Sequence, residues 1–263
     1  MQISGAKVLL TGASGGIGHA IARTLSERGG ELILTGRRVD VLEPLAAELN
    51  ARVIAADLAD RSALDRLLAD AGEIDILVAN AALPGVGALD SFTVEEIDRA
   101  LDVNLRAPIM LAHALAPEMV KRGRGHLLFM SSLNGKAATP LTSIYNATKF
   151  GMRGFASAIR EDLRSHDVGV STIFPGFIRD AGMFADSGTK LPPGVGTRTP
   201  QDVARATVKA IERNRAETDV APLTLRLGSS FASLAPEIAA SVSRRMGAHE
   251  VAGDMASGNA DKR

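Results

Sequence analysis

Residues 11–18 read Thr11-Gly12-Ala13-Ser14-Gly15-Gly16-Ile17-Gly18. An apolar, strand-like segment ends immediately before them, and a segment with helical spacing of apolar residues follows. Glycine is needed in such a turn because the chain must bend tightly and let its backbone approach a pyrophosphate. The N–H groups at the start of the helix then point at the anion, and the helix dipole favours negative charge. The turn predicts a dinucleotide-binding α/β fold, and a Walker phosphate loop fits poorly because no Gly-Lys-Ser/Thr follows.

Apolar runs recur along the chain and predict the strands of one sheet. They lie at Val8–Leu10, Leu32–Leu34, Arg52–Ala56, Ile74–Ala79, His126–Met130 and Val168–Phe174. Most are continuous rather than alternating with polar residues, which suits strands that are covered on both faces. Segments with helical spacing lie between them, at Ile17–Arg28, Val41–Leu49 and Ser62–Ala71. This alternation predicts right-handed crossovers and a doubly wound parallel sheet of the α/β class.

Two later helices have readable start signals. Thr93 and Glu96 form a capping-box pattern that opens Val94–Val103. Thr199-Pro200 opens a helix that runs to about Arg213. No internal repeat or linker interrupts the chain, so we predict one domain over residues 1–247.

Two regions depart from this alternation of strand-like and helical segments. Residues 179–198 are rich in glycine and proline and predict a long mobile loop at the substrate site. Residues 248–263 are small and polar and predict a disordered tail. An amphipathic stripe precedes this tail, with apolar residues at spacings of three and four: Phe231, Leu234, Ile238, Val242 and Met246. We expect the stripe to pack against the domain or a partner subunit rather than against a membrane surface.

The composition excludes several classes of protein. The chain has 263 residues, of which 46% are hydrophobic, so it can bury a sizeable core. It has no cysteine, and its five histidines lack ligand-like spacing, so no metal site is predicted. Thirty basic and thirty acidic residues cancel, which leaves no overall field to attract nucleic acid. No signal peptide and no apolar run of transmembrane length is visible, so a cytoplasmic protein is expected.

The chain's one tyrosine lies four residues before a lysine, in Tyr145-Asn146-Ala147-Thr148-Lys149. Helical spacing over Ala147–Leu163 puts both side chains on one face of a helix. A phenol with a pKa of about 10 is a poor base at neutral pH. A neighbouring ammonium, together with the positive ring of an oxidised nicotinamide, would lower that pKa and suit Tyr145 to general acid/base catalysis. Ser132, at the end of a predicted strand, can hold a substrate oxygen against the tyrosine hydroxyl.

These motifs resemble those of the short-chain dehydrogenase/reductase family, in its compact branch. The resemblance runs from residue 5 to about residue 225 and rests on T-G-x-x-x-G-x-G, on Y-x-x-x-K and on the spacing from Ser132 to Tyr145. It implies a single-domain Rossmann fold with a sheet of about seven strands. It also implies that Asn104 completes a Ser-Tyr-Lys-Asn tetrad by holding a water behind Lys149 through its backbone.

The resemblance assigns further residues to the cofactor. In the turn they are Gly12, Ser14, Gly15, Gly16, Ile17 and Gly18; elsewhere they are Asp57, Leu58, Asn80, Tyr145, Lys149, Pro175, Gly176 and Ile178. Asn80 lies in Ala79-Asn80-Ala81-Ala82, where the family usually has Asn-Asn-Ala-Gly, a segment that mainly stabilises the centre of the sheet. Arg179-Asp180 stand near the place where the family often has a threonine that binds the carboxamide.

The end of the second strand, Leu34-Thr35-Gly36-Arg37-Arg38, favours NADP(H) over NAD(H). An acidic side chain there would accept hydrogen bonds from the ribose of NAD, whereas a basic one accommodates the 2′-phosphate of NADP. Gly36 stands where NAD-preferring relatives usually carry Asp, and the planar guanidinium of Arg37 suits phosphate. The alternative is that Arg37 and Arg38 are a solvated pair at the start of a helix.

We therefore expect an NADP(H)-dependent oxidoreductase that interconverts a carbonyl and a secondary alcohol, with Tyr145 as general acid/base. Two alternatives stay open: a non-catalytic NADP(H)-binding sensor, and a family epimerase or dehydratase. The second usually carries T-G-x-x-G-x-x-G and a larger C-terminal domain.

A small-molecule substrate is the expected partner. The candidate walls of its site are mainly apolar: Leu133, Asn134, Thr139, Met183 and Phe184. A homodimer or homotetramer is also expected, because oligomers are common in the family and small residues at Ala147, Gly151 and Gly154 would let two helices approach closely.

Overall fold

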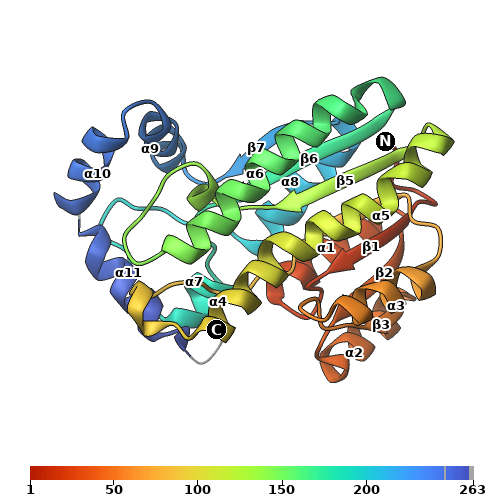
Figure 1. Ribbon diagram of the computed structural model, residues 1–263, viewed down its shortest axis with the longest axis horizontal. Coiled ribbons are helices and arrows are strands. Elements are labelled where there is room, and N and C mark those ends of the chain that lie inside the picture. Colours follow the sequence, from red (N-terminus) through yellow and green to blue (C-terminus); the bar gives the residue numbers. More distant parts are fainter. Residues whose placement is uncertain (246, 261–263) are drawn as a thin grey trace.

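One parallel sheet organises the computed structural model, which describes residues 1–245 and 247–260. Seven strands lie in the order β3-β2-β1-β4-β5-β6-β7 within these residues (Figure 1). They are β1 (Lys7–Thr11), β2 (Glu31–Gly36), β3 (Arg52–Ala55), β4 (Ile76–Ala79), β5 (Gly125–Met130), β6 (Val168–Pro175) and β7 (Glu217–Val220). The doubly wound α/β sheet predicted from the sequence is confirmed.

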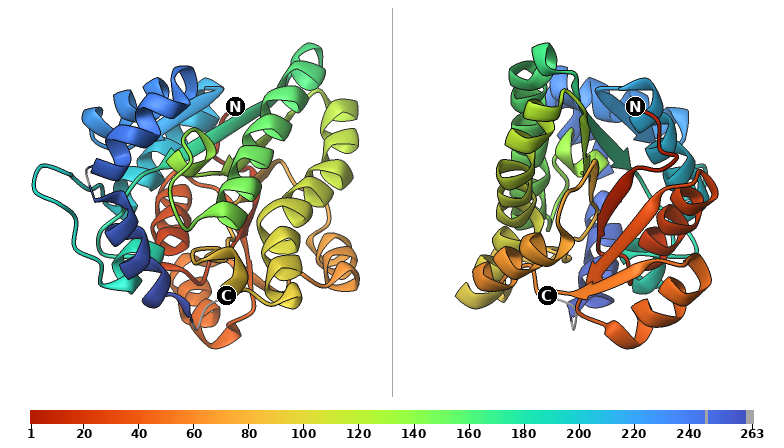
Figure 2. Two further views of the ribbon diagram at one scale, coloured as in Figure 1. Left: turned by 60° about the vertical axis from the view of Figure 1, so that its left-hand side comes forward. Right: turned by 90° about the vertical axis from the view of Figure 1, so that its right-hand side faces the viewer.

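Helices cover both faces of this sheet (Figure 2). On one face lie α1 (Gly16–Glu27), α2 (Val39–Leu49) and α8 (Pro200–Arg213); on the other lie α3 (Arg61–Ala71), α5 (Ala107–Arg122) and α6 (Ser143–Leu163). Successive residues of β1 enter different cores, because side chains alternate across a strand: Val8 and Leu10 pack on one face and Leu9 on the other. All three are fully buried, which explains why the apolar runs are continuous rather than alternating.

The start signals of the later helices are confirmed. Thr93 and Glu96 form a reciprocal capping box at α4 (Val94–Leu101). Thr199 forms a second box with Asp202 at the start of α8. The sequence did not predict how α4 ends, because a π-helical turn over Asp102–Arg106 joins it directly to α5.

The strand order creates a crevice beside β1. This strand lies between β2 and β4, and the crossovers on its two sides leave in opposite directions. In open parallel sheets, ligands bind at such a switch point, outside the carboxyl ends of the strands. The glycine turn follows the carboxyl end of β1, so the fold places it at this crevice.

The predicted loop at residues 179–198 contains regular structure. A short helix, α7 (Met183–Ser187), begins after Gly182 and ends before Gly188, two glycines with φ of 84° and 66°. A β-bridge between Ile178 and Arg198 closes the base of the segment. The glycines that suggested an unstructured loop therefore mark the two ends of a helix.

The predicted disordered tail is wrong over the described residues. Helix α11 (Ala248–Ser257) forms there and packs on α7, and Val251 and Met255 lie one helical turn apart on it. Residues 261–263 of that predicted tail lie outside the described residues. Before α11 come α9 (Leu223–Leu234) and α10 (Pro236–Arg245), at the end of the molecule opposite β3 (Figure 1).

The amphipathic stripe is not buried by the domain. Phe231, Leu234, Ile238 and Val242 are 46%, 85%, 60% and 47% exposed, so the chain's own core does not bury them. Packing against a partner subunit, the other part of the expectation, stays a prediction. Met246, the last residue of the predicted stripe, lies outside the described residues. Within the described part, every helix is too short or too polar to cross a bilayer.

Candidate active site

The glycine turn is held tightly against the neighbouring strand. Gly12 has a φ of 65°, and a Cβ there would lie 2.6 Å from the Cα of Ala81. A Cβ at Gly18 would lie 2.3 Å from the backbone oxygen of Gly12. Asn80 fixes the turn from β4, because its Nδ2 donates to the backbone oxygens of Thr11 and Gly12 at 3.2 and 3.1 Å. Asn80 therefore supports the turn that the sequence assigned to the cofactor.

The turn leaves the first N–H groups of α1 available to a ligand. Gly15 is the N-cap residue and has no side chain to bond them. The helix dipole adds to their attraction for an anion, so this end of α1 fits the pyrophosphate of a dinucleotide. The segment after β6 lies directly over it, since a Cβ at Gly16 would come within 2.5 Å of the Cβ of Ala181.

A single cavity of about 1440 Å³ joins the predicted site residues. Its lining includes all of the predicted cofactor residues: Gly12, Ser14, Gly15, Gly16, Ile17, Gly18, Arg37, Arg38, Asp57, Leu58, Asn80, Tyr145, Lys149, Pro175, Gly176 and Ile178. Ser132 and the five candidate substrate walls, Leu133, Asn134, Thr139, Met183 and Phe184, also line it. Asn104 is not among the lining residues.

Tyr145 and Ser132 are paired in the cavity. Burial raises the pKa of Tyr145 to about 12, and its hydrogen bond with Ser132 acts in the opposite direction. The Oγ of Ser132 also accepts a hydrogen bond from the backbone N–H of Asn134 at 3.2 Å. Ser132 lies two residues beyond the end of β5 and Tyr145 in the first turn of α6. A phenol with this pKa keeps its proton at neutral pH and is a proton donor.

Lys149 lies behind the tyrosine ring. Its Nζ is 5.4 Å from the ring centroid of Tyr145 and donates to the backbone oxygen of Met130 at 2.9 Å. The side chain is 2% exposed, and burial lowers the pKa of Lys149 to about 8. The lysine is therefore largely charged at neutral pH, and its ammonium has donors beyond the one that Met130 takes.

Asn104 belongs to the wall behind the site rather than to its surface. The residue is 2% exposed and lies in the π-helical turn between α4 and α5. Its side-chain oxygen accepts from the backbone N–H of Leu83 at 2.6 Å, and its Nδ2 donates to the backbone oxygen of Leu83 at 2.9 Å. π-Helical turns are frequent at functional sites, and this one fixes the segment after β4.

The arginine pair, Arg37 and Arg38, lines the cavity beside the glycine turn. Arg38 donates to the backbone oxygen of Ser14 at 2.7 Å, and Arg37 and Arg38 are both exposed. A Cβ at Gly36 would lie 3.3 Å from the Oγ of Ser14. The nearest acidic group in this part of the lining is engaged elsewhere: Asp57 accepts from Arg99 at 2.8 Å. Partial burial opposes ionisation, but Arg99 holds the pKa of Asp57 below its usual range.

Sequence reasoning missed the network behind the serine. Nδ2 of Asn134 donates to the side-chain oxygens of Thr139 and Asn146 at 2.9 and 3.1 Å. These hydrogen bonds hold the loop after Ser132 against the start of α6. Next to them, the Nζ of Lys136 lies 2.9 Å from Glu217 and 2.6 Å from Asp219. No spacing rule predicts such a pair, because its members are more than eighty residues apart in the chain.

Sequence reasoning also missed the cavity walls supplied by the C-terminal helices. Phe231, Ala232, Ala240, Val251 and Met255 line the cavity from α9, α10 and α11. The amphipathic spacing in this region was the available signal, but it does not say which apolar residues face a ligand site.

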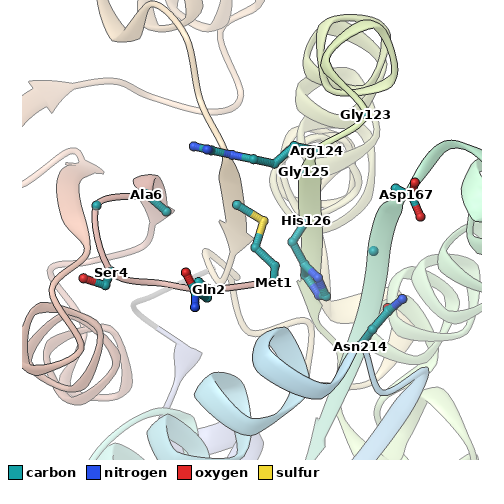
Figure 3. A pocket seen from close by; sticks show the side chains of 12 residues that line it. Met1, Gln2, Ser4, Ala6, Gly123, Arg124, Gly125, His126, Asp167 and Asn214 are labelled. Atoms are coloured by element: carbon teal, nitrogen blue, oxygen red, sulfur yellow. The ribbon is translucent and has the colours of Figure 1, made fainter.

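A second, smaller cavity of about 330 Å³ lies at the amino ends of the strands (Figure 3). Figure 3 shows its lining from the N-terminal segment, from the turn at Gly123 and from His126 at the start of β5. His126 is fully buried, and its Nε2 shares a 3.0 Å hydrogen bond with the Oγ of Ser171. Burial, followed by the N-terminal ammonium and Arg160, lowers the pKa of His126 to about 3. This cavity is separated from the glycine turn by the length of the strands.

Comparisons with known proteins agree with the fold. A family model described as short chain dehydrogenase matches residues 6–191. A ketoacyl reductase, HetN, from Nostoc sp. is 34% identical over 227 residues, which are 83% of this chain and 79% of that protein. Dehydrogenase/reductase SDR family member 7B of Xenopus laevis is 31% identical over 258 residues, 90% of this chain and 80% of that protein.

Solved structures agree as well. A short-chain dehydrogenase from Sphingobium yanoikuyae in complex with NADPH has a TM-score of 0.76 at 28% identity, over 89% of this chain and 95% of that one. A metagenomic short-chain oxidoreductase in complex with NADP has a TM-score of 0.70 at 32% identity, over 84% of this chain and 99% of that one.

Proposed function

The chain belongs to the short chain dehydrogenase family of oxidoreductases, and from this premise we propose that it interconverts a carbonyl and a secondary alcohol with NADP(H). One observation carries the proposal: Ser132, Tyr145 and Lys149 line the same cavity as the glycine turn. This arrangement supports a proton donor, a group that positions the substrate oxygen and a cation acting together on one bound dinucleotide and its substrate.

The protein's residues do the proton chemistry. When bound, the nicotinamide supplies the hydride in reduction or accepts it in oxidation. During reduction Ser132 holds the carbonyl oxygen and Tyr145 donates its phenolic proton to that oxygen, which completes the alcohol. Tyr145 then regains a proton from solvent, through Lys149 and a water held by the backbone of Asn104. In oxidation the same proton moves from the alcohol to the tyrosinate.

Lys149 has two roles in this proposal. Its ammonium would hold the hydroxyls of the nicotinamide ribose, using donors that Met130 does not take. The same charge stabilises the tyrosinate that forms when Tyr145 gives up its proton. The raised pKa of Tyr145, about 12 in the chain alone, shows how much stabilisation that anion needs from the lysine and the cofactor.

Three features of the second strand's end support NADP(H) over NAD(H). Gly36 offers no carboxylate to the adenine ribose, and Arg37 and Arg38 both line the cavity there. Asp57, the acidic residue in this part of the lining, is paired with Arg99. A 2′-phosphate would therefore meet two guanidinium groups near its binding place.

Replacement of Tyr145 by phenylalanine tests the proposal. NADPH oxidation is followed spectrophotometrically over a panel of ketones and aldehydes, and NADPH binding is measured by fluorescence for both proteins. We expect Tyr145→Phe to lose at least a hundredfold in kcat while it keeps NADPH affinity within about threefold. Full turnover by Tyr145→Phe on a substrate of the unchanged protein would refute the role of Tyr145. Tight cofactor binding without turnover on any carbonyl or alcohol would favour a sensor.

We also propose that two copies associate through α6. A Cβ at Gly151 would lie 3.2 Å from Leu105, so this glycine serves packing within the chain. Ala147 is exposed, Phe150 is 42% exposed, and a Cβ at Gly154 would meet nothing within 4 Å. Light scattering of the unchanged protein and of Gly154→Arg would test this interface, with loss of the dimer or tetramer expected in the variant.

A further inference from the structure

The active-site cavity extends well beyond the residues that the proposed chemistry uses. Its volume of about 1440 Å³ exceeds the roughly 300–1,000 Å³ of ordinary ligand pockets. The dinucleotide part runs from the glycine turn and the arginine pair to Tyr145. The remainder, which we name the C-terminal arm, is lined by residues of α7, α9, α10 and α11.

The walls of the C-terminal arm are mainly apolar or small. They include Met183, Phe184, Phe231, Ala240, Val251 and Met255. No lysine or arginine of these four helices is among the lining residues, and the charged residues there, Asp186 and Glu237, are both acidic. An anionic group would find no cation on the lining of these helices. Of the polar side chains there, Ser229 donates to the backbone oxygen of Arg226 and Asn259 to that of Met183. A neutral, apolar group fits the walls.

A glycine in the middle of α9 leaves room at the edge of this arm. Gly228 lines the cavity, and a Cβ built on it would meet no atom within 4 Å. Glycine inside a helix costs about 1 kcal/mol relative to alanine, and packing within this chain gives no steric reason for it. Gly228 is exposed, so a larger side chain there would have room at the edge of the cavity that this residue lines.

The arm is fixed to the catalytic part of the protein. Nδ2 of Asn259 donates to the backbone oxygen of Met183 at 3.0 Å, and Asn259 is 1% exposed. Gly258 packs so closely on α7 that a Cβ there would lie 2.5 Å from the backbone oxygen of Ser187. α11 and α7 thus form one wall, and α7 continues the segment that covers Gly16 and leads from Pro175.

From these observations we infer that the substrate carries a long, unbranched hydrocarbon chain next to its carbonyl, and that this chain lies in the C-terminal arm between α7, α9, α10 and α11. The inference rests on the proposed function for the reacting carbonyl and adds the class of substrate. The hydrocarbon chain gives binding energy through apolar contact alone, so each added methylene should increase kcat/KM for the ketone until the arm is filled.

A homologous series of 2-alkanones from four to twelve carbons tests the chain. With NADPH, we expect kcat/KM to rise by about fourfold for each added methylene over the first part of the series and then to level off. Equal kcat/KM values from 2-butanone to 2-decanone would overturn the inference while leaving the proposed function intact.

Variants that fill the arm test its location. Gly228→Leu adds a side chain in the open space. Leucine also favours the helix more than glycine does, so the fold is expected to persist. We expect it to lower the ratio of kcat/KM for 2-decanone to that for 2-butanone at least tenfold, and Ala240→Leu to do the same from α10. Leu227→Ala is the matched control, because Leu227 is 62% exposed on the same helix and does not line the cavity. Unchanged ratios in both filled variants would overturn the location.

A binding measurement separates this inference from the proposed function. The neutral dye Nile red is bound to Tyr145→Phe protein in the presence of NADPH and displaced with 2-decanone. Displacement that Gly228→Leu abolishes supports the arm even if no carbonyl is turned over, and that combination would refute only the proposed function. Turnover of short carbonyls without chain-length dependence or displacement would refute only the arm.

Discussion

The Nζ of Lys136 lies 2.6 Å from a carboxylate oxygen of Asp219, so the segment just behind Ser132 is anchored to the last strand of the sheet. Both side chains are nearly buried, with 10% and 12% of their surfaces exposed. The ammonium also lies 4.1 Å from the ring centroid of Phe174, on β6. The segment that carries Ser132, the residue proposed to position the substrate, is therefore supported by an ion pair outside the cavity.

Loss of this lysine should destabilise the protein. Lys136→Met leaves Asp219 nearly buried without its closest cation, and removal of one partner of a buried pair costs about 3–5 kcal/mol. Urea unfolding at pH 7 measures the change. The double variant Lys136→Met/Asp219→Leu should recover most of the loss, because the remaining carboxylate, Glu217, keeps its ion pair with Arg153 at 2.7 Å. Equal stability of Lys136→Met and the unchanged protein would contradict this account of the pair.

The reductive reaction should lose activity at high pH. Lys149 is charged below its pKa of about 8, and Tyr145 keeps its proton up to about pH 12, so the active state of the chain alone persists below pH 8. We expect kcat/KM for NADPH, which reports the free protein, to be level near pH 7 and to decline above pH 8. Lys149→Arg keeps its charge and should move the decline to higher pH. A decline at the same pH in this variant would show that another group titrates.

His126 should make the protein less stable in acid. Its pKa is about 3 in the folded chain and 6.5 in the unfolded chain, so between these values only the unfolded state binds the proton. Stability therefore falls as the pH drops from 6.5 toward 3, by about 1.4 kcal/mol per pH unit for this one group.

The variant His126→Gln removes that dependence. Urea unfolding between pH 4.5 and 8 should give a stability difference, unchanged protein minus variant, that is level above pH 7 and decreases steadily below pH 6.5. A difference that stays constant across the range would show that His126 is protonated equally in both states.

The cofactor preference should depend on the arginine pair. Loss of a hydrogen bond to a charged group costs about 1.5–3 kcal/mol, so the double variant Arg37→Ala/Arg38→Ala should raise KM for NADPH at least tenfold and change KM for NADH little. Arg61→Ala is the control for loss of one positive charge, because Arg61 is exposed at the start of α3 and does not line the cavity. Equal effects on NADPH and NADH would place the 2′-phosphate elsewhere.

How much of the structure can be predicted from the sequence depends on how far apart in the chain the interacting residues are. The glycine turn, the helix starts and the Tyr145–Lys149 spacing are local patterns, because a turn, a cap and an i,i+4 pair each involve neighbours in the chain. The Lys136–Asp219 pair and the Asn259–Met183 hydrogen bond join distant segments, and no local pattern encodes them. The tail was misread for the same reason: the contacts that hold α11 join Asn259 and Gly258 to α7, which lies about seventy residues earlier in the chain.

The π-helical turn over Asp102–Arg106 constrains the number of residues in this segment more than their identity. The N–H of Ala107 bonds the oxygen of Asp102, five residues back, so this turn contains one residue more than an α-helical turn. Removing one residue would rotate everything after it by about 100° and carry Leu111, Leu115 and Met119 away from the core. A one-residue deletion here is expected to unfold α5, whereas exposed substitutions in the same turn are tolerated.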